Sequence, residues 1–185
     1  PHLYTLSGGR RGVYFAINGA VLVALFSCAF LMGARRRPTL STWVWVVLES
    51  SLYALVMWLA LGKLLYALGF EPPALSLSAA DNLVMSFGAG VYEELVFRLG
   101  LLAGLLWLGR RKGLSAFPRY AIALVVSGAI FSAFHYSPLG LESWELWSFT
   151  YRLFAGMVFG VLFIGRGFAV AVYTHAIYDI LVLVF

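Results

Sequence analysis

The chain has 185 residues, of which 62% are hydrophobic and 11% are charged. A soluble globular domain is about one half apolar and about one quarter charged, so the composition excludes an ordinary soluble enzyme and predicts an all-α, polytopic membrane protein. The net charge of +5 does not indicate a nucleic-acid partner, because Lys and Arg cluster at the ends of apolar segments. The single cysteine, Cys28, excludes a disulfide framework within the chain and a cysteine-based metal site.

A membrane-spanning helix needs about 20 mostly apolar residues. We therefore expect a bundle of about six spanning helices in a single membrane-embedded domain, residues 1–185, with two helices within 12–65 before a core at about 80–185. The expected helices, separated by proline and polar residues, are Gly12–Gly33, Thr42–Leu65, Leu83–Gly109, Tyr120–Tyr136, Leu146–Ile164 and Phe168–Phe185. The first ends in "MGARRRP", a stop-transfer pattern, so we expect it to span the membrane rather than act as a signal peptide.

The Lys and Arg residues predict an orientation in the membrane. Eight of them follow the first, third and fifth apolar segments, whereas the loops on the other side carry mainly acids. The positive-inside rule therefore places these three loops in the cytoplasm and both termini outside, although Arg10 and Arg11 oppose this arrangement. The eight residues are Arg35–Arg37, Arg110, Arg111, Lys112, Arg119 and Arg166.

Ionisable residues inside apolar segments are costly and indicate a functional site by default. For Glu49 and Arg152 we favour a structural role. The full set within the expected helices is Glu49, Glu93, Glu94, Arg98, His135, Arg152, His175 and Asp179.

The stretch "VYEELVFRLG" contains two adjacent glutamates and an arginine. Glu94 and Arg98 are four residues apart on a helix, with the acid on the N-terminal side, so we expect them to pair and to reduce the cost of burying both charges. Glu93 is turned by about 100° from Glu94 and does not share that face. The spacing thus predicts a supporting role for Glu94 and a chemical role, as a general base or acid, for Glu93.

Two histidines lie in other segments. His175 and Asp179 are again four residues apart in "THAIYD", and His135 closes "FSAFH" one turn after Phe131. A single membrane histidine is more often a partner in an interhelical hydrogen bond than a catalyst. Together, however, these imidazoles and carboxylates are enough to activate a water molecule and to stabilise an oxyanion.

The three motifs resemble those of the CPBP family of intramembrane proteases, which includes the type II CAAX prenyl endopeptidases and the Abi proteins. "EELVFR" is similar to the E-E-x-x-x-R motif of that family, "FSAFH" to F-x-x-x-H, and "HAIYD" to H-x-x-x-N/D. They occur in family order, each in a separate apolar segment, and the resemblance covers about residues 80–185. It implies a helical membrane fold with a polar catalytic cavity between helices, and hydrolysis of a peptide bond by an activated water.

The resemblance also implies roles for individual residues. Glu93 and His135 would activate the water, and His175 and Asp179 would bind the oxyanion, with support from Glu94, Arg98 and Phe131. Asp179 takes a place often held by Asn in this family. An Asn amide donates a hydrogen bond directly, whereas an Asp must either be protonated or orient His175.

A metal is a second possibility for the same residues. Members of the family have been described as metalloproteases, and Glu93, His135 and His175 would make a three-ligand site for a divalent ion such as zinc. The sequence has no H-E-x-x-H pair, and a metal-free mechanism based on glutamate is equally consistent with the resemblance. We favour no cofactor; activity that survives thorough chelation would count against a metal.

The predicted orientation opens the cavity away from the cytoplasm. We therefore expect a multi-pass protein of a prokaryotic inner membrane that cleaves near the end of a membrane-associated or exported peptide, with the lipid bilayer and this peptide as its partners. Two other functions use the same residues. A non-catalytic binding or bacteriocin-immunity protein would keep its function without Glu93 and His135, and a small proton-coupled transporter would show transport in liposomes.

Overall fold

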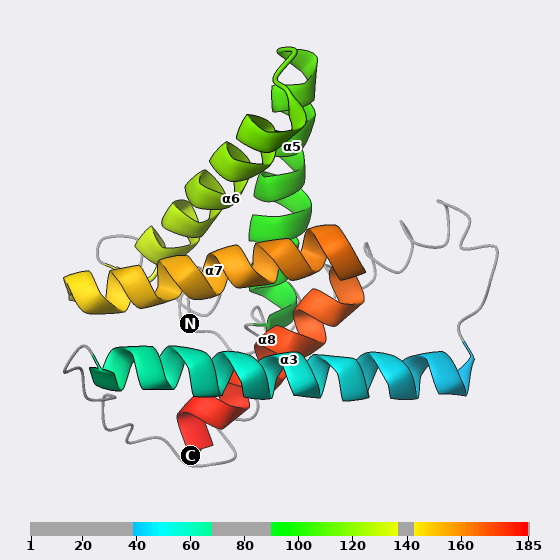
Figure 1. The fold of residues 1–185 in the computed structure, drawn as a ribbon, viewed down its shortest axis with the longest axis vertical. Coiled ribbons are helices and arrows are strands. Elements are labelled where there is room, and N and C mark those ends of the chain that lie inside the picture. Colours follow the sequence, from blue (N-terminus) through cyan, green and yellow to red (C-terminus); the bar gives the residue numbers. More distant parts are fainter. Residues whose placement is uncertain (1–38, 68–89, 137–142, 185) are drawn as a thin grey trace, which may run out of the picture. The chain divides into compact units, whose positions relative to one another are not determined.

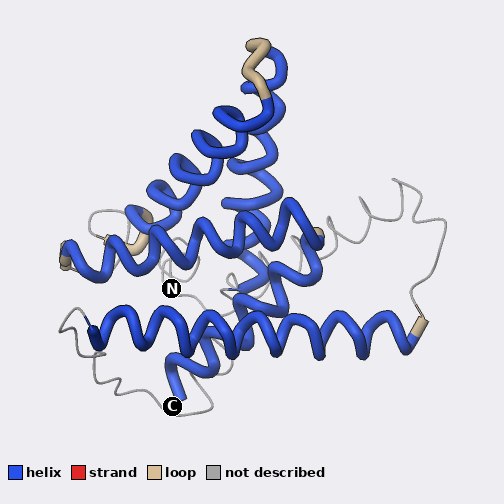
Figure 2. Tube along the Cα trace, in the orientation of Figure 1, coloured by secondary structure: helices blue, strands red, loops and turns tan. Residues whose placement is uncertain are grey.

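The structure, a computed structural model, describes residues 39–67, 90–136 and 143–184. Every regular element in these ranges is a helix, as predicted (Figures 1 and 2). By compactness the chain divides into units Pro1–Trp43 and Val44–Phe185, and the contacts given below lie within the second unit. The elements are α3 (Leu40–Ala67), η1 (Glu94–Leu102), α5 (Ala103–Arg111), α6 (Ala116–Ala133), α7 (Leu146–Arg166) and α8 (Phe168–Val184).

Three helices of the described residues are long and apolar enough to cross a membrane: Leu40–Leu64 within α3, and the whole of α6 and α7. They correspond to the second, fourth and fifth expected spans. The apolar part of α8 is shorter. The expected span Gly12–Gly33 lies outside the described residues, and the third expected span enters them only at residue 90. The described part of the chain thus fits a helical membrane bundle but contains fewer full-length spans than the six expected.

Helix α6 begins and ends earlier than the sequence predicts. It covers Ala116–Ala133 rather than Tyr120–Tyr136. The expected boundary leaves Pro118 in the preceding loop. A proline in the first turn of a helix loses no hydrogen bond, however, because the first N–H groups have no partner within the helix. At the other end, His135 lies in a turn just after α6, where its N–H donates to the carbonyl of Ser132. His135 is therefore held by a turn rather than by the helix itself.

Small residues bring α6 and α7 close together. A Cβ atom on Gly128 would lie 3.0 Å from the Leu153 carbonyl oxygen, and one on Gly156 would lie 2.9 Å from the Phe131 ring. Gly156 and Gly160 form the small-xxx-small pattern "GMVFG", which in membrane helices allows close approach of this kind. Gly100 and Gly104 form a second such pattern, "GLLAG", but a Cβ on Gly104 meets nothing within 4 Å in the described residues.

A buried apolar cluster joins three helices. It consists of residues from α3, α7 and α8, and Ser50 on α3 also donates a hydrogen bond of 3.3 Å to the carbonyl of Val170 on α8. These contacts hold the helix that carries His175 and Asp179 against its neighbours. The members of the cluster are Ala54, Met57, Ala155, Phe159, Leu162 and Tyr178.

The segment that carries the two glutamates is wider than an α-helix. Residues Glu94–Leu102 form the π-helix η1, in which the N–H of Ala103 donates to the carbonyl of Arg98, five residues back. π-Helical turns are rare in proteins, and those that occur are often found at functional sites. The carbonyl of Phe97 accepts a hydrogen bond of 3.1 Å from the hydroxyl of Ser127 on α6. A neighbouring helix therefore supplies a hydrogen-bond partner to the backbone of the π-helix. The sequence predicted an ordinary α-helix here.

Candidate active site

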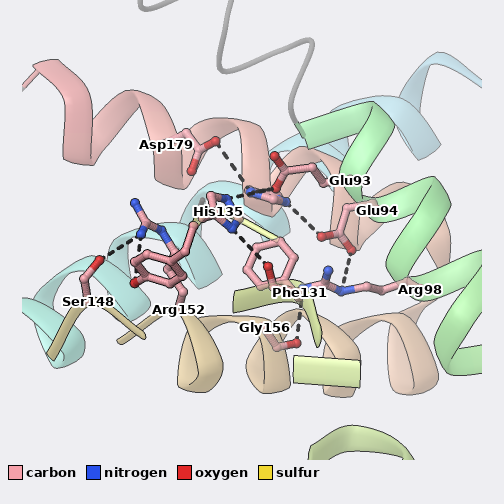
Figure 3. A network of polar contacts seen from close by, with 11 residues as sticks. Glu93, Glu94, Arg98, Phe131, His135, Ser148, Arg152, Gly156 and Asp179 are labelled. Carbon is pink, nitrogen blue, oxygen red and sulfur yellow. Dashed lines mark hydrogen bonds and ion pairs between the residues drawn. The ribbon is translucent and has the colours of Figure 1, made fainter. Parts of the chain in front are cut away.

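The structure brings together the four residues for which the sequence predicts chemistry. Glu93 immediately precedes η1, His135 follows α6, and His175 and Asp179 lie one turn apart on α8. The side chains of Glu93, His135 and Asp179 point toward one another (Figure 3). Glu93 Oε2 lies 3.9 Å from His135 Nε2 and 3.8 Å from His175 Nε2. Asp179 Oδ2 lies 3.5 Å from the same nitrogen of His175. One carboxylate oxygen is thus within 4 Å of both imidazoles.

The four side chains of the site differ in their exposure to solvent. The side chains of Glu93, His135 and Asp179 are 16%, 22% and 24% exposed, whereas that of His175 is 4% exposed. The three partly exposed groups can meet a ligand or water, and the buried imidazole lies beneath them.

Glu94 binds two partners rather than one. The ion pair that the spacing predicts is present, with Glu94 Oε2 3.2 Å from Arg98 Nε. Its other oxygen, Oε1, lies 2.8 Å from His175 Nδ1, which donates the hydrogen bond. The sequence indicated no contact between Glu94 and His175. This contact fixes which edge of the imidazole faces Glu94, and it turns Nε2 toward Glu93 and Asp179.

Arg98 is almost completely buried and is surrounded on several sides. Its Nη2 donates a hydrogen bond of 3.1 Å to the carbonyl of Gly156 on α7. The guanidinium carbon lies 4.5 Å from the centre of the Phe131 ring and 5.5 Å from that of Phe159. Cation–π contacts of this kind favour a buried guanidinium when water is absent. Arg98 therefore ties η1 to both α6 and α7.

The orientation of His135 follows from a backbone contact. Its Nδ1 lies 3.0 Å from the carbonyl oxygen of Phe131. A carbonyl can only accept a hydrogen bond, so Nδ1 carries the proton and donates it. In the neutral imidazole, Nε2 then carries a lone pair on the edge that faces Glu93. Phe131, predicted as a supporting residue, thus supplies both this carbonyl and the ring beneath Arg98.

Two supporting contacts were not predicted from the sequence. The ring of Phe159 on α7 stacks on His175, with ring centres 4.3 Å apart and planes 18° apart. Arg152 donates hydrogen bonds through Nη1 to the hydroxyl of Ser148 at 2.8 Å and to that of Tyr136 at 3.2 Å. Tyr136 is the residue that follows His135. No local pattern distinguishes Phe159 from the other aromatic residues of an apolar helix, so the stacking could not be found without the arrangement of the helices.

Glu49 contacts residues outside this site. Its carboxylate accepts both hydrogen bonds of a bidentate pair with Arg166 at the end of α7, one of them 2.8 Å long. It also accepts a hydrogen bond of 2.9 Å from Tyr53. The structural role favoured for Glu49 therefore joins α3 to α7.

Glu93, His135 and His175 are the three side chains that would hold a divalent ion. Within the described part of the chain, no group of three or more His, Cys, Asp or Glu is arranged to hold an ion. The expectation that the protein needs no cofactor stays a prediction.

A helical membrane protein that gathers carboxylates and imidazoles between its helices has the parts of an enzyme that acts on a bond within the bilayer. Residues 75–181 match the family described as type II CAAX prenyl endopeptidase Rce1-like. Since the match covers more than half of the chain, the chain belongs to this family, and its general class is that of a CAAX-type intramembrane endopeptidase with a peptide or protein substrate. All four candidate residues lie within the matched range. No curated protein and no solved structure matches the chain.

The shared carboxylate of Glu94 leads to a prediction that separates stability from catalysis. Glu94→Leu leaves the buried guanidinium of Arg98 without its anion, which should lower the free energy of unfolding by about 3–5 kcal/mol. The double variant Glu94→Leu/Arg98→Met replaces the whole pair by apolar groups and should recover most of that stability. It should not recover cleavage, because His175 still lacks its acceptor.

Thermal unfolding of the purified proteins in detergent measures the first effect. Mass spectrometry of membrane peptides from expressing cells measures the second. If the double variant recovers cleavage together with stability, Glu94 has no role in orienting His175.

Proposed function

We propose that the chain is an intramembrane endopeptidase in which Glu93 and His135 activate a water molecule for attack on a peptide bond. The observation that carries this proposal is the position of Glu93 Oε2, within 4 Å of Nε2 of both His135 and His175. Separations of 3.8–3.9 Å are too long for direct hydrogen bonds. They suit one small bridging group such as a water.

In this mechanism the water donates hydrogen bonds to Glu93 and to Nε2 of His135. As its oxygen forms a bond to the carbonyl carbon, Glu93 takes one proton. The tetrahedral intermediate then loses its C–N bond, and the proton passes from Glu93 to the leaving nitrogen. The products are one new carboxyl group and one new amine. Proton transfer of this kind contributes about 10²–10⁴-fold to a rate.

His175 is proposed to stabilise the oxyanion. Glu94 is paired with Arg98 and acts as a hydrogen-bond acceptor toward Nδ1 of His175. The other ring nitrogen, Nε2, also faces carboxylate oxygens, those of Glu93 and Asp179. The imidazolium, which has a donor on each nitrogen, satisfies both sides. Its Nε2–H would donate to the oxygen that gains negative charge in the intermediate.

Asp179 is proposed to share this work with His175. Its position 3.5 Å from Nε2 of His175 supports a role in holding the ring, one of the two alternatives that the sequence leaves open. Its partly exposed carboxyl group also faces the substrate side, where a protonated form would donate directly to the oxyanion.

The substrate is proposed to be a membrane-associated or exported peptide, reached from outside the cytoplasm of a prokaryotic cell. The course of α6 supports this side of the membrane. The helix begins at Ala116, beside four Lys and Arg residues, and ends at Ala133, two residues before His135. At about 1.5 Å per residue these ends are roughly 27 Å apart, close to the thickness of the bilayer core. If the basic end lies in the cytoplasm, the site lies near the opposite face.

Glu93→Gln should abolish cleavage, because an amide cannot take the proton from water. We expect a loss of at least about 10²-fold with unchanged thermal unfolding, measured by mass spectrometry of membrane peptides. Glu49→Gln is the matched control: it makes the same chemical change on α3 and should keep cleavage. Function that survives both Glu93→Gln and His135→Ala would instead support a non-catalytic binding or immunity protein.

Asp179 can be tested by two substitutions of similar size. The amide of Asp179→Asn can accept from His175 and donate to an oxyanion, so this variant should keep cleavage within about tenfold. Asp179→Leu can do neither and should lose about 10²–10³-fold, as when one oxyanion donor is removed. Equal loss in the two variants would mean that the carboxylate charge itself is required.

The orientation can be tested with single cysteines in a Cys28→Ser background. Ser115 lies between α5 and α6, Ser143 lies between His135 and α7, and both are exposed. On intact cells, a membrane-impermeant maleimide should label Ser143→Cys and should label Ser115→Cys only after permeabilisation. The reverse pattern would place the site on the cytoplasmic side and exclude exported substrates.

A further inference from the structure

The turn between α5 and α6 carries a concentrated positive charge. Helix α5 ends at Arg111, and the chain reverses through Lys112 and Gly113, whose φ of 74° favours glycine. Arg110, Arg111 and Lys112 are exposed. Arg119 lies on the first turns of α6, where a Cβ on Gly109 would lie 2.9 Å from its Cγ, so its aliphatic stem packs against α5. We call Arg110, Arg111, Lys112 and Arg119 the basic turn.

No acid pairs with the basic turn in the part of the chain that the structure describes. The sequence contains no Asp or Glu between Glu94 and Glu142. Within the described residues, none of its four cations takes part in an ion pair, whereas Arg98 and Arg166 are each paired with a glutamate. The four positive charges of the basic turn therefore act together on whatever lies beside it.

Exposed aromatic side chains accompany these cations. The guanidinium of Arg111 lies 5.0 Å from the centre of the Trp107 ring, and that of Arg119 lies 5.2 Å from that of Tyr120. Trp107 is 59% exposed, and Phe117 is 85% exposed. Tryptophan and tyrosine at the end of a spanning helix are typical of the headgroup region of a membrane. The basic turn, at the start of the spanning helix α6 (Figure 1), is therefore expected at the level of the lipid phosphates.

We propose that the basic turn is a binding site for anionic phospholipid headgroups. Several cations that project from the end of a membrane helix attract anionic lipids, and arginine in particular forms bidentate hydrogen bonds with phosphate. The exposed Phe117 and Trp107 would lie among the acyl chains just below the phosphates. Positive charge anywhere in the loop is enough to orient a protein in the membrane. The proposed lipid site depends instead on the cations and aromatic residues of the hairpin formed by α5 and α6.

The experiment is a lipid titration of the purified full chain in neutral detergent, followed by native mass spectrometry. Phosphatidylglycerol is compared with phosphatidylcholine. The wild type should bind the anionic lipid more tightly, and less so at high salt. Each cation near a membrane surface contributes about fivefold, so Arg110→Gln/Arg111→Gln/Lys112→Gln should weaken binding of phosphatidylglycerol on the order of 100-fold.

A matched control removes the same charge elsewhere. The triple glutamine variant of Arg35–Arg37, the other run of three cations in the sequence, should weaken the binding of phosphatidylglycerol much less than the basic-turn variant does. Arg110→Lys/Arg111→Lys keeps the charge and should retain most of the affinity, which guards against a folding defect. Equal loss in both triple variants, no preference of the wild type for the anionic lipid, or displacement of the lipid by millimolar inorganic phosphate would each overturn the proposal.

Discussion

The carboxylate of Glu94 is the interaction on which the rest of the site depends. A charge at membrane depth is costly unless it is paired, and this fully buried group satisfies two partners at once, Arg98 through one oxygen and His175 through the other. Because Arg98 also binds the carbonyl of Gly156, a single anion connects η1 to α7 and α8. The adjacent residue, Glu93, is thereby directed to the edge of His175 that Glu94 leaves open. Glu93, the acid proposed to act on water, is thus positioned by its neighbour.

Close packing of apolar helices is what makes this network geometrically possible. The guanidinium of Arg98 lies close to the rings of Phe131 and Phe159, which belong to α6 and α7. These helices can approach closely enough only because Gly128 and Gly156 have no side chains at their contact. The aromatic rings in turn contact the imidazoles. Glycines with no chemical function are thus as necessary to the arrangement as the charged groups that they allow to meet.

The sequence predicts well whatever a single helix determines. The spacing of Glu94 and Arg98, and of His175 and Asp179, places each pair on one face, and both pairs are in contact. It does not determine how one helix is rotated against another. The hydrogen bond from His175 to Glu94 joins residues 81 positions apart, so no local pattern could reveal it. The π-helical turn was missed for a related reason, because it is stabilised in part by Ser127 of another helix.

Charged groups are paired near one end of α6 and unpaired near the other, and the surroundings of the two ends explain this difference. Near His135 the ionisable groups lie among buried apolar side chains, where an unpaired charge would be destabilising, and each of the buried charges has a partner of opposite sign. At the basic turn three of the four cations are exposed, and all four are unpaired within the described residues. Such unpaired charge is tolerable only where water or lipid phosphates can reach it. Paired charge therefore belongs to the interior that holds the candidate site, and unpaired charge belongs to the membrane surface. The same helix separates the two environments by about the thickness of the bilayer core.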